Sequence, residues 1–326
     1  MSTVGLDAAM STTDSTTRSA TGVFGRASSS SIGIMAVLGS TVFWGIGSSF
    51  GARAHLPGVV LSFWRMWIAA AMISLLTVVT RRWPSWADFR HSIPMGVLFG
   101  LNICAFFITI EYISISVALI IGSLTSVVAL PIAVIFMGER LNATKVICAV
   151  VAVAGVVGAV LSAPSSSSPG DAALGYVWAV ISLVAWTTYL LASKVVRRSV
   201  ETTRLMMCST VIGSITVSVI VPFVHADIGM MTGTRWVWVS LLALVPGLLG
   251  HSLFAWAQPR VDASVSSVLI QGEPVLASVS AWLLLGQQVS LLQMLSMGVV
   301  VGALAVLAWR ESREPNALLP DDDPRV

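Results

Sequence analysis

The stretch that decides the fold is residues 268–286, VLIQGEPVLASVSAWLLLG, where a glutamate and a proline interrupt an otherwise apolar sequence. It lies in an apolar run over residues 263–285, which matches the roughly 20 apolar residues that a membrane-spanning helix needs. A charge inside such a helix costs at least about 2.5–3.5 kcal/mol on insertion scales, so it generally faces a cavity or a partner. We therefore expect Glu273 to face the protein interior.

The composition is that of a polytopic membrane protein. Of the 326 residues, 56% are hydrophobic and 10% are charged, and the mean hydropathy is +0.89. Soluble domains carry about 25% charged residues. Cys104, Cys148 and Cys208 all fall in apolar runs without disulfide or metal-site spacing, so redox and metal chemistry are not expected.

Ten apolar runs are each long enough to span a bilayer, which predicts an all-α integral membrane fold. The runs cover residues 32–52, 57–79, 93–112, 115–137, 144–161, 174–192, 204–223, 236–257, 263–285 and 291–309.

The polar segments divide the chain into two halves. We expect a disordered cytoplasmic tail over residues 1–31 and a second cytoplasmic tail over residues 310–326, because both are polar and rich in small residues or proline. An external loop over residues 162–173 separates a first five-helix unit, residues 32–161, from a second, residues 174–309.

The two halves align weakly with each other. Laying Gly138 on Gly286, an offset of 148, also lays Ser116 on Ser264 and aligns Val127, Ala129 and Ala133 with identical residues. Two units with an odd number of helices lie in opposite orientations when they follow in series. This predicts inverted-topology repeats, an architecture of secondary transporters that bind substrate near the bilayer midplane.

The basic residues predict the orientation. Fifteen of the 18 Lys and Arg residues lie on the side of the N-terminus, whereas Arg53 and Arg235 lie on the other side and Arg65 lies within a helix. Basic residues accumulate on the cytoplasmic side of membranes. We therefore expect a multi-pass protein of the cytoplasmic (inner or plasma) membrane with both termini in the cytoplasm.

The chain resembles the EamA-type carriers of the drug/metabolite transporter superfamily over residues ~32–309. The resemblance rests on the order and spacing of FWGIGSSF (43–50), PGVVLSFWRM (57–66), GERL (138–141), SLVAWTTYLLASKVVRR (182–198) and GEPVLASVSAWLLLG (272–286). It implies two EamA repeats and the export or uptake of small organic solutes, often amino acids or related metabolites.

Two positions depart from the family pattern. Ser126 replaces a proline of the fourth helix, which puts the symmetric kink of that helix in doubt, and Pro131 follows five residues later. Gln287 replaces the glutamate of the second turn motif, for which we expect an effect on a loop contact alone.

Arg65 and Glu273 are the strongest candidates for a binding site. Glu273 lies about ten residues into its run and Arg65 about eight residues into a run of the opposite direction, so both reach the middle of the bilayer. The hypothesis is that they line or pair across a central cavity, with Arg65 holding a substrate carboxylate and Glu273 a substrate ammonium or a proton. The alternative is a structural ion pair between two helices.

Several polar and aromatic residues in the inner parts of other runs are weaker candidates, since packing explains each of them equally well or better. Gln271 joins the cavity only if Gly272 or Pro274 distorts the helix, and His251 is better explained as a packing residue. The predicted substrate-binding set is Arg65, Glu273, Trp44, Ser48, Asn102, Ser126, Trp186, Tyr189 and Gln271.

The leading interpretation is a secondary active transporter, an exporter of small polar or zwitterionic metabolites such as amino acids, working by alternating access. We expect no enzyme activity, no cofactor, no metal and no nucleic-acid partner; a proton is the candidate coupling ion. The partners are a small-molecule solute and the lipid bilayer. The GxxxG pair Gly298 and Gly302 predicts close helix packing and makes a homodimer a candidate. The alternatives are an exchanger or uptake carrier for phosphorylated or nucleotide-linked sugars, and a non-transporting membrane scaffold.

Overall fold

The computed structural model describes residues 7–113, 115–162 and 172–313, and it describes residues 7–29, 115 and 116 by their backbone alone. Within these ranges the chain is helical and contains no strand. Ten helical segments are long and apolar enough to cross a membrane, which confirms the ten predicted spans. The predicted loop over 162–173 and the tail over 310–326 fall largely outside the described residues.

The helices follow one another with short connections. The first half contains α1 (Asp7–Ala54), α2 (Gly58–Val79), α3 (Trp86–Tyr112), α4 (Ile115–Ser123), α5 (Thr125–Met137) and α6 (Ala143–Leu161). The second half contains α7 (Ala172–Val196), α8 (Thr202–Ile220), the 3₁₀ turns η1 (Val221–Val224) and η2 (Ile228–Met230), α9 (Arg235–Leu242), the π-helix η3 (Ala243–Gly250), α10 (His251–Ala257), the 3₁₀ turn η4 (Gln258–Arg260), α11 (Ala263–Leu269), α12 (Gly272–Leu285) and α13 (Leu291–Glu311).

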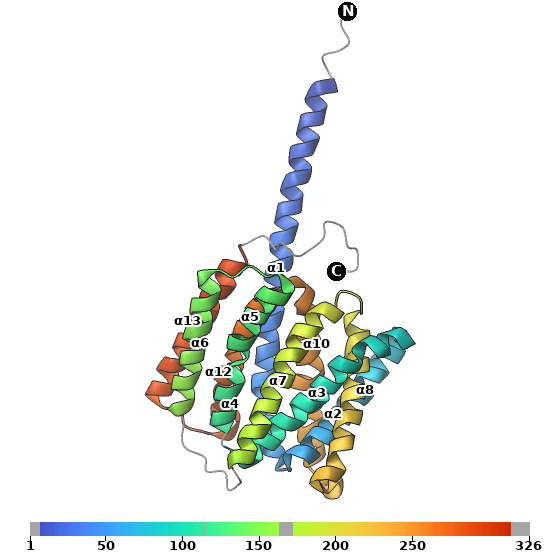
Figure 1. The fold of residues 1–326 in the computed structure, drawn as a ribbon, viewed down its shortest axis with the longest axis vertical. Coiled ribbons are helices and arrows are strands. Elements are labelled where there is room, and N and C mark those ends of the chain that lie inside the picture. The colour runs from blue at the N-terminus through green and yellow to red at the C-terminus, as the bar shows by residue number, and fades with distance from the viewer. Residues whose placement is uncertain (1–6, 114, 163–171, 314–326) are drawn as a thin grey trace, which may run out of the picture.

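The first helix is longer than the sequence pattern predicts. The span is Ser30–Ala54, but α1 begins at Asp7 and projects beyond the bundle, where a disordered tail is expected (Figure 1). Extending an existing helix adds one hydrogen bond per residue without a new nucleation step, so a polar segment can continue a helix that it would not start.

Specific residues end and begin the helices at the turns. Gly138 and Gly286 both follow a helix in the left-handed conformation, with φ of +68° and +70°. Left-handed backbone at this position favours glycine. The two residues that the repeat alignment pairs therefore have the same backbone role.

Two of the spans are broken in the middle of the bundle. The span Val117–Met137 divides at Leu124 into α4 and α5, and the span Ala263–Leu285 divides at residues 270–271 into α11 and α12. The break between α4 and α5 forms although Ser126 stands where the family has proline. The fourth spanning helix is therefore interrupted without that proline.

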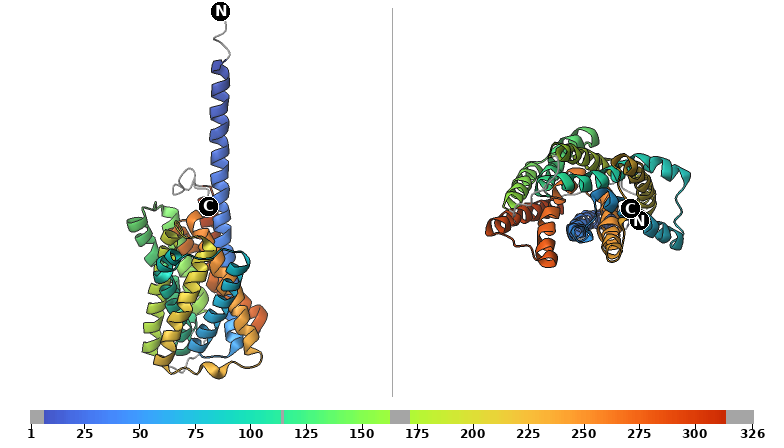
Figure 2. Two further views of the ribbon diagram at one scale, coloured as in Figure 1. Left: turned by 90° about the vertical axis from the view of Figure 1, so that its right-hand side faces the viewer. Right: turned by 90° about the horizontal axis from the view of Figure 1, so that it is seen from below.

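The second broken span, α11 and α12, packs against α1. α1 packs against α12 on one side and against α9, η3 and α10 on the other, as the view along the bundle shows (Figure 2). α3 packs against α7 and α8, α6 packs against α13, and α5 packs against α11. In Figure 1, α5 lies at the end of the bundle from which α1 projects, and α4 lies at the other end. We call these the N-terminal end and the opposite end.

The face of α13 that carries Gly298 and Gly302 is not packed against any other described residue. Both glycines are exposed, and a Cβ atom at either position would meet no described atom within 4 Å. The close packing predicted for this pair is therefore wrong within the chain. Gly155 instead packs tightly in the α6–α13 contact, where a Cβ atom would lie 2.7 Å from Val300 Cγ2.

Candidate functional site

A cavity of about 410 Å³ lies in the interior of the bundle. Its wall is built by α1, α2 and their connection, by α3, α4, α5, α7, α9, η3, α10 and α12, and by the break before α12. Seven residues of the predicted set line it: Trp44, Ser48, Arg65, Asn102, Trp186, Gln271 and Glu273. The remaining two, Ser126 and Tyr189, lie behind the wall.

Arg65 projects from α2 into the cavity and is 6% exposed. Its guanidinium carbon lies 5.6 Å from the centre of the Phe107 ring, within the range of a cation–π contact. Within the described residues, the guanidinium has no hydrogen bond and no ion pair. Its five N–H donors are therefore free to bind a planar acceptor such as a carboxylate.

Glu273 lies in the first turn of α12 and also lines the cavity. Its backbone N–H donates to the Ile270 carbonyl oxygen at 3.0 Å, but its carboxylate has no hydrogen bond within the described residues. Arg65 and Glu273 act on each other as opposite charges without forming a direct ion pair. The structural ion pair considered from the sequence is thus absent between these two described residues.

Gln271 reaches the cavity because the helix breaks immediately before Gly272. On an unbroken helix Gln271 and Glu273 would point in different directions, since two residues correspond to about 200°. The Gln271 amide nitrogen donates to the Ser123 carbonyl oxygen at 2.5 Å and to Ser126 Oγ at 2.9 Å. Ser126 therefore positions Gln271 from behind the wall.

Aromatic side chains form one side of the cavity. Trp44 and Trp186 meet edge to face with ring centres 5.3 Å apart, and Trp44 lies 5.0 Å from His251. Tyr189 is 1% exposed and stacks on Trp186 at 5.4 Å, so it supports the wall without lining it. Trp44 Nε1 and His251 Nδ1 are buried and have no partner within the described residues.

Two of the polar candidates already bond within the chain. The Asn102 amide nitrogen donates to the backbone oxygen and the hydroxyl of Ser182 at 3.2 and 3.1 Å. The Ser48 hydroxyl donates to the Gly45 carbonyl oxygen at 2.8 Å. Their remaining acceptor atoms are what they can offer to a solute.

The cavity residues missing from the predicted set include His251, Thr125 and Glu111. His251 reads as a packing residue in the sequence but lines the cavity. Thr125 begins α5, and its buried hydroxyl has no partner within the described residues. Glu111 lies at the end of α3, where its carboxylate accepts from the Gly58 backbone N–H. The repeat offset pairs Thr125 with Glu273, which is the signal that could have identified it.

The cavity reaches the opposite end of the bundle and stops short of the N-terminal end. At the opposite end it is lined by His55 and Glu111, which are both exposed. At the N-terminal end the interior is filled by buried residues such as Gln258 and Ser264. A solute would therefore enter this conformation from the opposite end.

The described residues contain no group of three or more His, Cys, Asp or Glu side chains that could hold a metal ion. Among the described residues, Arg65 and Glu273 are the charged cavity side chains without a hydrogen bond or ion pair, and the aromatic wall lies beside them. Glu111, by contrast, accepts from the Gly58 N–H. The arrangement can bind a small molecule that carries both a negative and a positive group.

Comparisons with known proteins agree with this architecture. The model of the EamA-like transporter family matches residues 31–161 and 173–309, one match for each half. A protein of Archaeoglobus fulgidus named uncharacterized transporter is 26% identical over 276 residues, which are 81% of this chain and 95% of the relative.

A solved structure described only as crystal structure of protein has a TM-score of 0.70 at 22% identity and covers 89% of this chain and 100% of its own. This likeness shows the fold alone. The two family matches cover most of the chain and correspond to the two five-span halves. The chain therefore belongs to the EamA-like transporter family of the drug/metabolite transporter superfamily and is a multi-pass membrane transporter.

Proposed function

We propose that this chain is a secondary active transporter that exports small zwitterionic metabolites, amino acids among them, across the cytoplasmic membrane by alternating access. The observation that carries the proposal is the pair Arg65 and Glu273: two opposite charges line one intramembrane cavity and neither has a hydrogen-bonded or ion-paired partner within the described residues. Buried charges are normally paired. A ligand with a carboxylate and an ammonium group supplies both partners.

Arg65 binds the carboxylate of the substrate in this proposal. The first residue of α5, Thr125, lines the same cavity and adds a free hydroxyl at the positive end of a helix dipole. Broken helices of transporters present their N-terminal ends to anionic groups in this way. Glu273 binds the ammonium group, and the Trp44–Trp186 wall covers the apolar part of the solute.

The two EamA repeats support alternating access. Each repeat contributes five spans, so the second repeat has the opposite orientation to the first when every span crosses the membrane. The excess of basic residues on the N-terminal side supports a cytoplasmic location for both termini. In that orientation the cavity faces the outside of the cell.

Proton coupling follows from the use of one carboxylate for two cations. Glu273 can hold either the substrate ammonium or a proton, and the two exclude each other. If the cavity turns outward with substrate bound and turns back with a proton on Glu273, each cycle exchanges one substrate molecule for one proton. The inward proton gradient then drives export.

A carrier for phosphorylated or nucleotide-linked sugars fits the cavity less well. A phosphate group requires neutralisation by more than one cation, commonly arginine. Arg65 is the one Lys or Arg that lines the cavity in the described part of the chain. This alternative is therefore the second candidate.

The test is a counterflow assay with purified protein in liposomes and a panel of amino acids and other metabolites. Wild type is compared with Glu273→Gln and Arg65→Ala at equal incorporation. Glu201→Gln is the matched control, because Glu201 is a half-buried carboxylate that pairs with Arg82 outside the cavity. A charged hydrogen bond is worth about 1.5–3 kcal/mol, which corresponds to roughly a ten- to hundredfold rise in the half-saturation concentration for the cavity variants.

Each result decides the proposal. Counterflow of a zwitterion that the two cavity variants lose, while Glu201→Gln retains it, supports the proposed site. Wild-type counterflow in both cavity variants would show that Arg65 and Glu273 are structural. Counterflow confined to phosphorylated solutes would favour the second candidate.

A further inference from the structure

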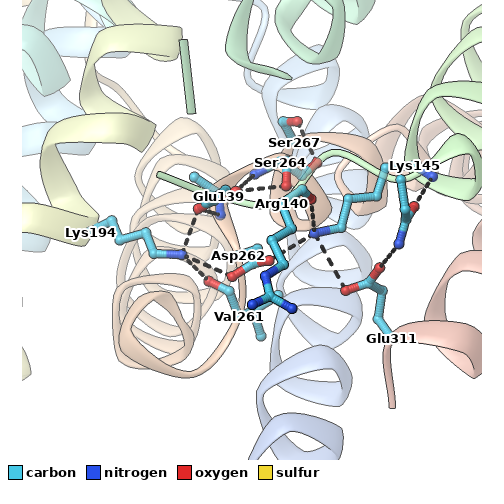
Figure 3. Close-up of polar contacts among 11 residues, drawn as sticks. Glu139, Arg140, Lys145, Lys194, Val261, Asp262, Ser264, Ser267 and Glu311 are labelled. Carbon is cyan, nitrogen blue, oxygen red and sulfur yellow. Dashed lines mark hydrogen bonds and ion pairs between the residues drawn. The ribbon is translucent and has the colours of Figure 1, made fainter. Parts of the chain in front are cut away.

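Five charged residues form a network of ion pairs at the N-terminal end of the bundle (Figure 3). It consists of Glu139, Lys145, Lys194, Asp262 and Glu311, which come from five separate elements or turns. Lys194 pairs with Glu139 at 2.8 Å and with Asp262 at 3.6 Å. Lys145 pairs with Asp262 at 2.8 Å and with Glu311 at 3.7 Å. The network therefore joins the first half of the chain to the second.

Glu139 is the best-bonded member of this charge network. Besides Lys194, its carboxylate accepts from the backbone N–H of Ala263 at 2.7 Å and from the N–H and hydroxyl of Ser264 at 3.0 and 2.6 Å. The Glu139 side chain is fully buried. Four donors around a buried carboxylate compensate its desolvation.

The half-helices α5 and α11 are joined by hydrogen bonds at both of their ends. Glu139 follows the C-terminus of α5 and bonds the N-terminus of α11. Gln271 follows the C-terminus of α11 and bonds Ser126 in the first turn of α5. The two helices thus run in opposite directions and are fastened at both ends, on the side where the cavity stops.

Within the described residues, the other halves of the broken helices, α4 and α12, do not form a comparable packed pair. α4 contributes Leu119 and Gly122 to the cavity wall, and α12 contributes Pro274 and Ala277. The open part of the pathway is therefore lined by α4 and α12, and the closed part is filled by α5 and α11.

The repeat offset assigns equivalents to Glu139, to its hydrogen-bond partner Ser264 and to the neighbouring Gly138. An offset of 148 pairs Glu139 with Gln287 and pairs Ser264 with Ser116 at the start of α4. It also pairs Gly138 with Gly286, which share the same left-handed backbone. In the exchanged conformation α12 and α4 would therefore meet as α5 and α11 meet here, but with neutral Gln287 in place of the carboxylate.

We infer that the charge network is a latch that holds the N-terminal end closed, and that Gln287 makes the equivalent closure of the opposite end weaker. The carrier therefore rests with its cavity open to the opposite end. This inference rests on the alternating access of the proposed function. Within it Glu139 is a positioning residue that sets the balance between two conformations.

The test measures from which side a cavity residue can be labelled. Gly122 lines the cavity, and a Cβ atom at this position would meet no described atom within 4 Å, so Gly122→Cys is a suitable reporter. The native residues Cys104, Cys148 and Cys208 are buried, and the chain without the reporter gives the background. A membrane-impermeant maleimide is added to either side of oriented proteoliposomes.

The reporter chain should be labelled mainly from the side opposite to the N-terminus. Adding Glu139→Gln should increase labelling from the N-terminal side by about tenfold or more, because it removes one charge from a buried pair. Gln287→Glu, which leaves the latch intact, should decrease labelling from the opposite side. Glu201→Gln should change neither rate.

Unchanged labelling from both sides in Glu139→Gln would overturn the latch. If Glu139→Gln does not fold, Gln287→Glu decides: equal labelling with and without it would overturn the inference. The readout needs no substrate, so a shift in labelling without counterflow of any zwitterion upholds the latch and removes the proposed substrate. Counterflow of a zwitterion with unshifted labelling would uphold the proposed substrate and overturn the latch.

Discussion

The bundle contains two kinds of buried charge, and their hydrogen bonds distinguish them. Glu139 is bonded by Lys194 and by three further donors. Arg65 is buried and Glu273 is half-buried in the cavity wall, and neither side-chain charge has a hydrogen bond or ion pair within the described residues. A bonded charge is satisfied by the fold, whereas a free charge in a cavity requires a ligand, water or a proton.

Glu139 should remain ionised through mild acidification. Burial alone would raise the pKa of its carboxyl, but the Lys194 ammonium and the hydrogen bonds from Lys194 and Ser264 outweigh burial and lower it. A carboxylate with a lowered pKa stabilises the fold at pH above its unfolded pKa of about 4.3 and loses this effect as the pH falls through the folded pKa.

We therefore expect Glu139→Gln to lower the free energy of unfolding by about 1.5–3 kcal/mol, by the same amount at every pH between about 7 and 5. The difference from wild type should shrink below about pH 4. Thermal unfolding of wild type and Glu139→Gln at a series of pH values from about 7 to below about 4 measures this difference in stability. A difference that disappears between pH 7 and 5 would contradict the lowered pKa.

Residue type and position identify some cavity residues in the sequence but not others. Arg65 and Glu273 are recognisable because a charge in an apolar run is costly wherever it lies. His251 and Thr125 are not, since histidine and threonine also serve as ordinary contacts between helices. Only the fold shows that His251 Nδ1 and the Thr125 hydroxyl lack hydrogen-bond partners in the described part of the chain.

At the scale of elements, the breaks in the spans make the site. Gly272 and Pro274 indicate the break before α12 directly, because glycine and proline weaken helix interiors. The break before α5 has no such residue at Ser126. There the Ser126 hydroxyl donates to the Ser123 carbonyl oxygen at 3.3 Å, and Gln271 bonds both residues from the other repeat. A break stabilised across the bundle cannot be read from a local sequence pattern.

The contact between α1 and α12 should tolerate no side chain at Gly45. A Cβ atom there would lie 2.5 Å from Leu276 Cβ and 2.8 Å from the Leu276 backbone carbon. The backbone cannot move away cheaply, so Gly45→Ala should destabilise the protein by about 1–3 kcal/mol. Gly122→Ala is the control, because a Cβ atom there would have no described neighbour within 4 Å.

Thermal unfolding of the two alanine variants in the same detergent decides this prediction. Gly45→Ala should unfold at a lower temperature than wild type, and Gly122→Ala should unfold close to it. Equal unfolding temperatures for both variants would show that α1 and α12 can separate without cost. Gly45 lies in FWGIGSSF, so this contact also gives a physical reason for a glycine in that motif.

At the scale of the whole molecule, hydropathy alone is enough to predict ten spans, because each must cross the same thickness of hydrocarbon. The extension of α1 beyond the bundle and the exposed face of α13 differ from the sequence-based expectations. The α1 extension and the exposed α13 face depend on which helix surfaces pack against each other in the fold. Small residues that face lipid cannot be told from small residues that face another helix in the sequence. The closed and open ends are likewise a property of the assembled halves.

The proposed exchange has a consequence for the membrane potential. A zwitterion carries no net charge, so exchanging one exported zwitterion for one imported proton moves one positive charge inward in each cycle. Moving one charge across the membrane is worth about 2.3 kcal/mol per 100 mV. An inside-negative potential of this size should therefore support roughly a fiftyfold outward gradient of substrate.

Proteoliposomes loaded with labelled substrate, with the termini inside and equal pH on both sides, test this consequence. A potassium gradient with valinomycin sets the potential. Efflux should accelerate when the inside is negative and slow when the inside is positive, in wild type and in the Glu201→Gln control alike. Efflux that responds to a pH gradient but not to the potential would contradict the exchange of one proton for one zwitterion. Efflux that responds to neither would rule out the proton as the coupling ion, and Glu273 would then bind the substrate ammonium alone.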